Sequence, residues 1–280
     1  MKNDKKKVYL DQKDNYNKNF GIVYRSSAIF YYKQNKNFNT VISFMNYWPI
    51  KRSIDIMMVA SIRDMKGKLI HRERLSFDTG NVINYQPTIG DGNFEGSVEL
   101  EAFAADNLMI PYIAIMVIYE AEESVSMVHA YTRTYSTHEI EEGKTITYGE
   151  EAGWVCRDTN DIHSYLILHN GISTQSKQKI KLWVTNYENI TKEVVVEIPQ
   201  LSSFETIKIY PQKYIKNFVE FLNGKVGSCA VSFELSGGFT RGMVCNETID
   251  GKEMQVYHSN FNYGRHDPGL VEHKEAFFSF

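Results

Sequence analysis

Hydrophobic and polar residues alternate with a period of two along much of the chain. The runs Lys179–Val184, Ala230–Leu235 and Ser97–Phe103 place a hydrophobic residue at every second position. Successive side chains of a strand point to opposite faces, so this pattern is typical of strands with one buried and one solvated face. Together with segments rich in Val, Ile, Phe and Tyr, it predicts strands at Thr40–Phe44, Ser53–Arg63, Gly96–Ala104, Ile113–Tyr119, Tyr165–Leu168, Lys179–Thr185, Glu193–Ile198, Phe204–Tyr210 and Ala230–Leu235.

Turn-forming residues separate these segments at intervals of about ten residues, which favours a β-sandwich or barrel over an α/β fold. The pairs Asn170-Gly171 and Asp250-Gly251 are examples of such turns. One short helix is expected at Lys213–Leu222, because its apolar residues lie on one side. The pair Asn223-Gly224 that follows is a helix-stop signal.

Short sequence patterns recur in the same order in the two halves of the chain, which indicates an internal repeat. In order, Phe44-Met45-Asn46 aligns with Leu168-His169-Asn170, Ser97–Glu101 with Ala230–Glu234, Met116-Val117 with Met243-Val244, and Tyr135–Glu139 with Tyr263–Asp267. We therefore predict an all-β chain of two tandem, related antiparallel β-sandwich units that pack as a pseudo-dimer. The units span residues 20–145 and 152–280, and residues 1–19 form a disordered polar tail.

The second unit carries an order of elements found in a known family. A strand at Tyr165 leads to Asn170-Gly171, then to a strand pair ending at Ile207–Ile209, and finally to Ala230–Glu234 and Phe239–Arg241. This order resembles the small β-sandwich of the sensory rhodopsin transducer family over a limited part of the chain. The resemblance implies a cytoplasmic binding module similar to carbohydrate-binding domains. The chain departs from that family in its two copies and its long C-terminal segment, so a shared activity does not follow.

The overall charge and the cysteines narrow the classes of function. The net charge is −3, whereas nucleic-acid binding needs a clustered basic face, so we expect no nucleic acid as partner. Cys156, Cys229 and Cys245 have no metal-ligand spacing, which indicates reduced thiols in a reducing compartment. No apolar segment is long enough to span a bilayer, and no signal peptide follows the first lysines. We expect a cytoplasmic protein without a membrane partner.

Histidines next to carboxylates are the candidate reactive groups. Unit one has His129 and His138-Glu139, and unit two has His258, His266, Asp267 and His273. Such groups could hold a divalent metal or transfer protons, and the four residues of unit two form the candidate metal site. Their spacing fits no known ligand signature. The alternative is that these side chains cap strand ends or support the contact between the units.

Aromatic and planar polar residues gather near the end of each unit. A sugar site needs an aromatic face for the C–H side of the ring and planar polar groups for the hydroxyls. The same composition would suit a peptide or nucleotide ligand, or ordinary strand and interface contacts. The candidate ligand-binding residues are Tyr131, Arg133, Tyr135 and His138 in unit one and Asn260, Asn262, Tyr263, Arg265 and His266 in unit two.

Three functions follow as hypotheses. The first is a non-enzymatic binding module for a glycan or sugar-containing metabolite, without a cofactor, that could form a homo-oligomer. The second is a metal-dependent enzyme that uses His258, His266, Asp267 and His273. The third is a structural or signalling adaptor that binds partner proteins. The chain has no GxSxG nucleophile elbow and no P-loop, so no catalytic residue is assigned.

Overall fold

Antiparallel strands dominate the fold. The computed structural model describes residues 24–76, 80–104, 115–129, 133–136, 146–172, 174–236, 242–258 and 260–261. Every strand pair in these residues is antiparallel, and the strands form two five-stranded and two four-stranded sheets. The predicted all-β, β-sandwich-like fold is therefore confirmed.

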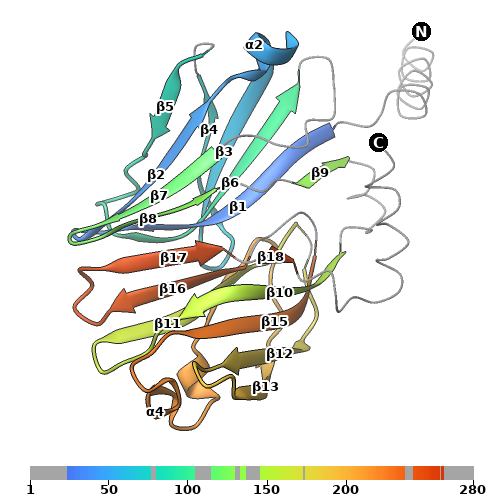
Figure 1. The fold of residues 1–280 in the computed structure, drawn as a ribbon. Helices are drawn as coiled ribbons and strands as arrows, with labels where there is room; N and C mark the ends of the chain where they lie inside the picture. The colour runs from blue at the N-terminus through green and yellow to red at the C-terminus, as the bar shows by residue number, and fades with distance from the viewer. Residues whose placement is uncertain are drawn as a thin grey trace, which may run out of the picture.

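The first half of the chain forms one sheet of five strands and one of four (Figure 1). The orders are β4-β3-β6-β1-β9 and β5-β2-β7-β8. The strands are β1 (Tyr24–Gln34), β2 (Phe38–Met45), β3 (Ile56–Asp64), β4 (Leu69–Leu75), β5 (Val82–Tyr85), β6 (Phe94–Ala104), β7 (Ile115–Ala121), β8 (Val125–His129) and β9 (Arg133–Ser136), with a short helix α2 (Trp48–Arg52) after β2.

The second half repeats this order strand for strand. Its sheets run β13-β12-β15-β10-β18 and β14-β11-β16-β17, which is the first half's order with each label raised by nine. The strands are β10 (Ile146–Cys156), β11 (Ile162–His169), β12 (Gln178–Thr185), β13 (Thr191–Ile198), β14 (Thr206–Ile209), β15 (Gly227–Ser236), β16 (Met243–Thr248), β17 (Met254–His258) and β18 (Asn260–Phe261), with η1 (Pro211–Lys213) and α4 (Phe218–Leu222) between β14 and β15.

The four-stranded sheet of the second half has two buried faces. Leu166 and Val244 of this sheet belong to a core that lies within the second half. Tyr165, Ile167 and Cys245 alternate with them and join a core built mainly from the first half. Because side chains alternate between the faces of a strand, one sheet serves both cores. In Figure 1, β17 accordingly lies next to the first half, and β16 lies beside β17.

The seam, by which we mean the contact surface between the two halves, also joins two sheet edges. Strands β8 and β17 lie side by side, and serine hydroxyls link them. The amide N–H of Met254 donates to Ser124 Oγ at 2.9 Å, and that of Val256 donates to Ser126 Oγ at 3.0 Å. These bonds satisfy backbone groups at edges that would otherwise be open to pairing with another chain.

The predicted strands are present, but two expectations need correction. The single helix at Lys213–Leu222 is wrong, because η1 ends at Lys213 and α4 begins only at Phe218, after Asn217 adopts a left-handed φ of 54°. The predicted stop is confirmed, since Asn223 closes α4 with a φ of 50°. Strand β3 starts at Ile56 rather than Ser53, because Ser53 ends helix α2.

Residues 146–151 were placed outside both predicted units, but they belong to β10. This segment is acidic and contains glycine, like a linker, yet β10 lies between β15 and β18 in its sheet. Its strand conformation therefore comes from pairing with distant segments, which local composition does not reveal. The predicted tail at residues 1–19 lies outside the described residues.

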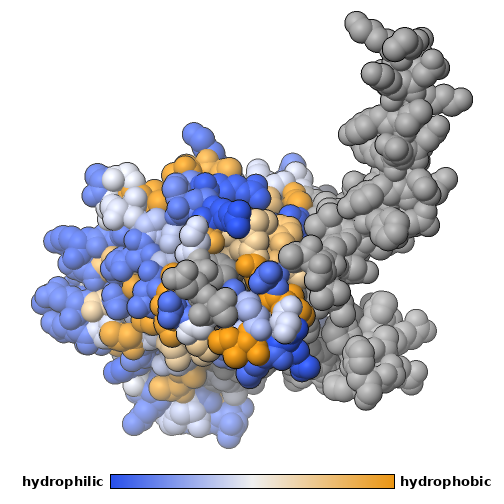
Figure 2. Space-filling model, turned by 90° about the horizontal axis from the view of Figure 1, so that it is seen from above, coloured by the Kyte–Doolittle hydropathy of each residue, from blue (hydrophilic) through white to orange (hydrophobic). Residues whose placement is uncertain are grey.

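All three cysteines are buried and have free thiols. Cys229 lies in β15 and Cys245 in β16, where they pack as small apolar side chains. In the described part of the chain, no helix is long and apolar enough to cross a membrane. On the face drawn in Figure 2, hydrophobic residues form several separate groups among hydrophilic ones.

Candidate functional site

Only part of the predicted ligand and metal sites falls on residues that the structure describes. Arg133 and Tyr135 lie in β9, Asn260 in β18 and His258 in β17. The others lie outside the described residues, namely Tyr131, His138, Asn262, Tyr263, Arg265, His266, Asp267 and His273.

The strand registers place the described ligand candidates at corresponding sheet edges. In β9, Arg133 pairs with Ser27 and Tyr135 pairs with Arg25 of β1. In β18, Asn260 pairs with Ala152 of β10. Strands β9 and β18 are the last strands of the two five-stranded sheets, so the two predicted sets belong to equivalent positions in different sheets.

Next to β9, the outer face of the first five-stranded sheet carries a buried charge network. Arg25 Nη1 and Arg72 Nη2 contact the two carboxylate oxygens of Glu101 at 2.6 and 3.2 Å. Arg63 Nη1 contacts Glu99 Oε2 at 2.8 Å, and Ser27 Oγ donates to Glu99 Oε1 at 3.0 Å. All four carboxylate oxygens therefore have a partner.

This network is a structural layer rather than a binding site. Phe204 of the second half stacks over the Arg63 guanidinium, with 3.8 Å from the ring centre to Cζ. Burial raises the pKa of Glu101, the nearby Glu99 raises it further, and Arg25 opposes both effects. Charges that are withdrawn from water in this way stay ionised only if they keep all their partners. The groups of this network are therefore already engaged with one another and leave few hydrogen-bonding positions for a ligand.

A polar groove of about 500 Å³ lies at the end of the first half. The β1–β2 turn forms one wall, Gln86 and Gly92 from the segment between β5 and β6 form another, and the end of β7 closes it. The lining residues are Gln34, Asn35, Lys36, Asn37, Phe38, Asn39, Gln86, Gly92, Glu120, Ala121 and Glu122. Side-chain amides and carboxylates therefore make up most of the polar lining.

Hydrogen bonds within the first half hold one side of this groove in place. Asn35 Oδ1 accepts from the amide N–H of Asn37 at 2.9 Å, which shapes the turn. Gln34 Oε1 accepts from the amide N–H of Ile89 at 3.0 Å, which ties the turn to the segment after β5. Phe38 is buried behind the turn with Lys33 Nζ above its ring, so it contributes packing rather than an open aromatic face.

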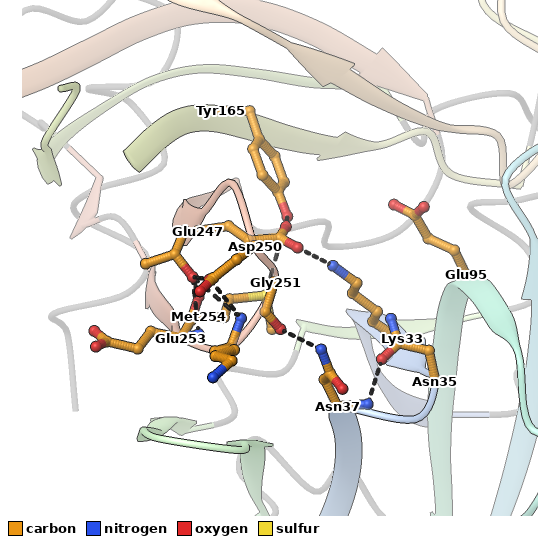
Figure 3. A network of polar contacts seen from close by, with 12 residues as sticks. Lys33, Asn35, Asn37, Glu95, Tyr165, Glu247, Asp250, Gly251, Glu253 and Met254 are labelled. Atoms are coloured by element: carbon orange, nitrogen blue, oxygen red, sulfur yellow. Dashed lines mark hydrogen bonds and ion pairs between the residues drawn. The ribbon is translucent and has the colours of Figure 1, made fainter. Parts of the chain in front are cut away.

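A polar network links the β1–β2 turn to the second half across the seam. Asn37 Nδ2 donates to the carbonyl oxygen of Gly251 at 3.2 Å. Figure 3 shows Lys33 and Tyr165 converging on Glu247, whose Oε1 pairs with Lys33 Nζ and whose Oε2 accepts from the Tyr165 hydroxyl at 2.6 Å. The β1–β2 turn is therefore held against the second half through Asn37, and the end of β1 is held there through Lys33.

A second network of lysine, glutamate and tyrosine crosses the seam with the roles of the halves exchanged, so that the second half supplies the lysine and the first half the glutamate. Lys208 of the second half pairs with Glu95 of the first, which also accepts from the Tyr31 hydroxyl at 2.7 Å. Burial would raise the pKa of Glu95, but the bonds from Lys208 and Tyr31 outweigh it and lower that pKa. Burial raises the pKa of Tyr31 and Tyr165, and their glutamate partners add to the rise, so both phenols stay protonated as donors.

The structure brings His258 next to His129 of the other half. Their ring centres lie 4.5 Å apart with the planes at 85°. In the sequence these residues belonged to separate candidate clusters. Among the residues that the structure describes, no group of three or more His, Cys, Asp and Glu side chains could hold a metal ion.

The groove residues were missed by sequence reasoning, although a signal was present. The segment Gln34–Asn39 has amide side chains at four of its positions and lies just before the predicted strand Thr40–Phe44. Such a composition is typical of a turn, so it indicated loop structure without indicating a binding surface. No protein-family model matches this chain, and no curated protein sequence matches it.

Proposed function

We propose that the protein is a non-enzymatic binding module for a polyhydroxylated ligand, a glycan or a sugar-containing metabolite. The observation that carries this proposal is the amide-lined groove beside the β1–β2 turn. A side-chain amide donates and accepts hydrogen bonds, and a sugar hydroxyl also does both. The groove therefore offers matching partners at several points around one ring.

The support of the groove favours binding. Asn35, Gln34 and Asn37 are already held by hydrogen bonds to the fold, so part of their entropy is lost before a ligand arrives. Gln86 and Glu120 are exposed at the rim and present polar groups to the solvent. This arrangement suits a small polar ligand that loses few of its hydrogen bonds to water on binding.

A glycan array probed with the full chain tests the proposal, followed by calorimetry on each sugar that binds. The variants Gln86→Ala and Asn39→Ala remove one groove amide each. Each is expected to weaken binding by about tenfold, the effect of losing one or two hydrogen bonds. The matched control is Asn84→Ala, an exposed amide on β5 outside the groove, which is expected to bind like the wild type.

Either of two results would remove this function. One is an array in which no sugar class binds. The other is a bound sugar whose affinity is unchanged in both groove variants, which would place the ligand elsewhere. Equal melting temperatures for the three variants would show that the comparison reports on binding and not on folding.

We also propose that the two halves are related copies of one unit and pack as a pseudo-dimer. The matching strand orders and the shared core support this relation. Scanning calorimetry of the full chain is expected to show one unfolding transition, because the seam buries side chains of both halves in one core. Two separate transitions would contradict the pseudo-dimer.

A further inference from the structure

The two four-stranded sheets have the same strand order, but their outer faces lie in different surroundings. By outer face we mean the face turned away from the five-stranded sheet of the same half. In the second half, this face packs into the core that is shared with the first half, and its apolar side chains are at most 3% exposed. These side chains are Tyr165, Ile167, Met243, Cys245, Met254 and Val256.

The strand registers show which positions of the first half correspond to this buried face. A Met-Val pair occurs in β7 and again in β16, and the second residue after its methionine is Ile118 in β7 and Cys245 in β16. Ile118 pairs with Met127 of β8. In the same way, Cys245 pairs with Val256 of β17. Met127 therefore occupies the position of Val256 in a sheet of the same strand order.

The corresponding face of the first half is open to solvent. Met127 and Val125 of β8 are 56% and 69% exposed. Met45 of β2 and Val82 of β5 pair with each other and are 38% and 65% exposed. An exposed apolar patch of this kind is typical of an interaction site. We call this surface the open face, and its apolar side chains are Met45, Val82, Met116, Ile118, Val125 and Met127.

The polar groups of the open face indicate what could cover it. Among its described residues, the ionisable side chains are Glu120 and His129, which lie at opposite ends of the β7–β8 pair. A second copy of the open face therefore offers apolar side chains to apolar side chains. The outer face of the second five-stranded sheet fits less well, because Lys181 and Glu193 are hydrated there and would lose water on contact.

We propose that two copies of the chain pair through their open faces to form a two-fold symmetric dimer. Pairing of one patch with itself is the commonest way in which identical chains associate. Strand β8 carries the open face and also contacts β17, so the open face is continuous with the seam. The dimer would cover in the first half the sheet face that the seam covers in the second. The proposal does not depend on the sugar-binding function.

The size of the open face sets the expected affinity. Four strands about 4.8 Å apart, each about six residues long, give a face about 20 Å on a side. Two such faces bury less than a standard interface of about 800 Å² per partner. We therefore expect a dissociation constant in the micromolar range, which makes the dimer dependent on concentration.

Sedimentation velocity of the full chain over a series of concentrations tests the proposal. The wild type is expected to shift from monomer to dimer as its concentration rises. Met127→Glu is expected to weaken the dimer by about tenfold or more, because it places a carboxylate from each copy in an apolar contact. The matched control is Val195→Glu, at an exposed apolar position of the edge strand β13, which is expected to dimerise like the wild type.

Methionine oxidation locates the contact without a substitution. Hydrogen peroxide converts exposed methionines to sulfoxides, and mass spectrometry measures the rate at each position. Met45 and Met127 are expected to react more slowly at high than at low protein concentration. Met57 on β3 is 36% exposed and lies outside the open face, so its rate is expected to stay the same.

Several results would overturn the proposal. One is a wild type that stays monomeric throughout the concentration series. Another is a dimer that is as stable in Met127→Glu as in the wild type, or oxidation rates at Met45 and Met127 that ignore concentration. An assembly larger than a dimer that Met127→Glu disperses would show that the open face meets a different surface, which would exclude the two-fold pairing.

Discussion

The two five-stranded sheets have the same strand order. The charged side chains on their outer faces, however, differ in their exposure to water. In the first sheet, the outward side chains of Glu99 and Glu101 on β6 are only 4% and 3% exposed. In the second sheet, the outward side chains of Glu193 and Glu197 on β13 are 48% and 56% exposed and pair with equally exposed lysines. Strand β6 is the central strand of its sheet, whereas β13 is an edge strand whose counterpart in the first half is β4. Glu73 on β4 is 42% exposed, so exposed carboxylates lie on the edge strand in both sheets.

The comparison shows that the exposure of a carboxylate, which differs between a central and an edge strand, decides how much its ion pair matters for stability. Exposed pairs gain little, because water screens them and holding two long side chains costs entropy. Buried pairs lose their hydration, so each ion depends on its partner. The second half contributes to this burial where Phe204 covers Arg63. Acidic and basic side chains therefore contribute to the stability of the fold in the first sheet and to a hydrated surface in the second.

The largest effect is expected from Glu99→Gln in the buried layer. The change leaves the Arg63 guanidinium buried without its carboxylate, and removing one partner of a buried pair costs about 3 kcal/mol. Urea unfolding of the full chain at pH 7 measures the loss as a lower midpoint at an unchanged slope. A midpoint equal to that of the wild type would show that the layer is solvated and that the contrast between the central and the edge strand is wrong.

An intermediate effect that depends on pH is expected at His169, the last residue of β11. Its counterpart at the end of β2 is Met45, which is 38% exposed, whereas His169 is fully buried. Burial lowers the pKa of His169 from 6.5 to about 3. The unfolded chain therefore takes up a proton below pH 6.5 that the folded chain does not, so stability falls as the pH drops from 6.5 towards 3. At pH 5 the loss is about 2 kcal/mol.

The variant His169→Met gives this position the residue of the first half and removes that proton. The wild type is expected to lose stability between pH 7 and pH 5, and the variant is expected to lose about 2 kcal/mol less over the same interval. Urea midpoints at the two pH values measure the difference. The control is His163→Gln, on the exposed part of the same strand. It is expected to lose as much stability between pH 7 and pH 5 as the wild type. An equal loss of stability between pH 7 and pH 5 in the wild type and in His169→Met would contradict the lowered pKa of His169.

The smallest effect is expected from Glu193→Gln, the same chemical change at an exposed carboxylate of the edge strand β13. Glu193 accepts from Trp183 Nε1 at 2.6 Å and lies 3.5 Å from Lys181 Nζ, but all three groups are in water. We expect a urea midpoint equal to that of the wild type within error. A loss as large as that of Glu99→Gln would mean that exposure does not separate the two strands.

Local pattern was enough to predict a strand such as Lys179–Thr185, because one of its faces is buried and the other is partly or fully exposed. The local pattern failed to predict strands that are buried by segments distant in the sequence. Strand β1 is buried on both faces, so Ala28 to Tyr32 show no alternation. The groove was missed for a related reason, since its walls come from a turn, a segment after β5 and the end of β7.

By itself the sequence determined the all-β character, the positions of most strands and the recurrence of patterns in the two halves, because these depend on side-chain period and turn chemistry within short segments. Only the tertiary structure decided which charges are buried, which half covers the other and which histidines meet. Those outcomes depend on contacts between residues such as His129 and His258, or Arg63 and Phe204, that lie far apart along the chain. Their free energies arise from water removed when distant surfaces pack, and no local pattern carries that information.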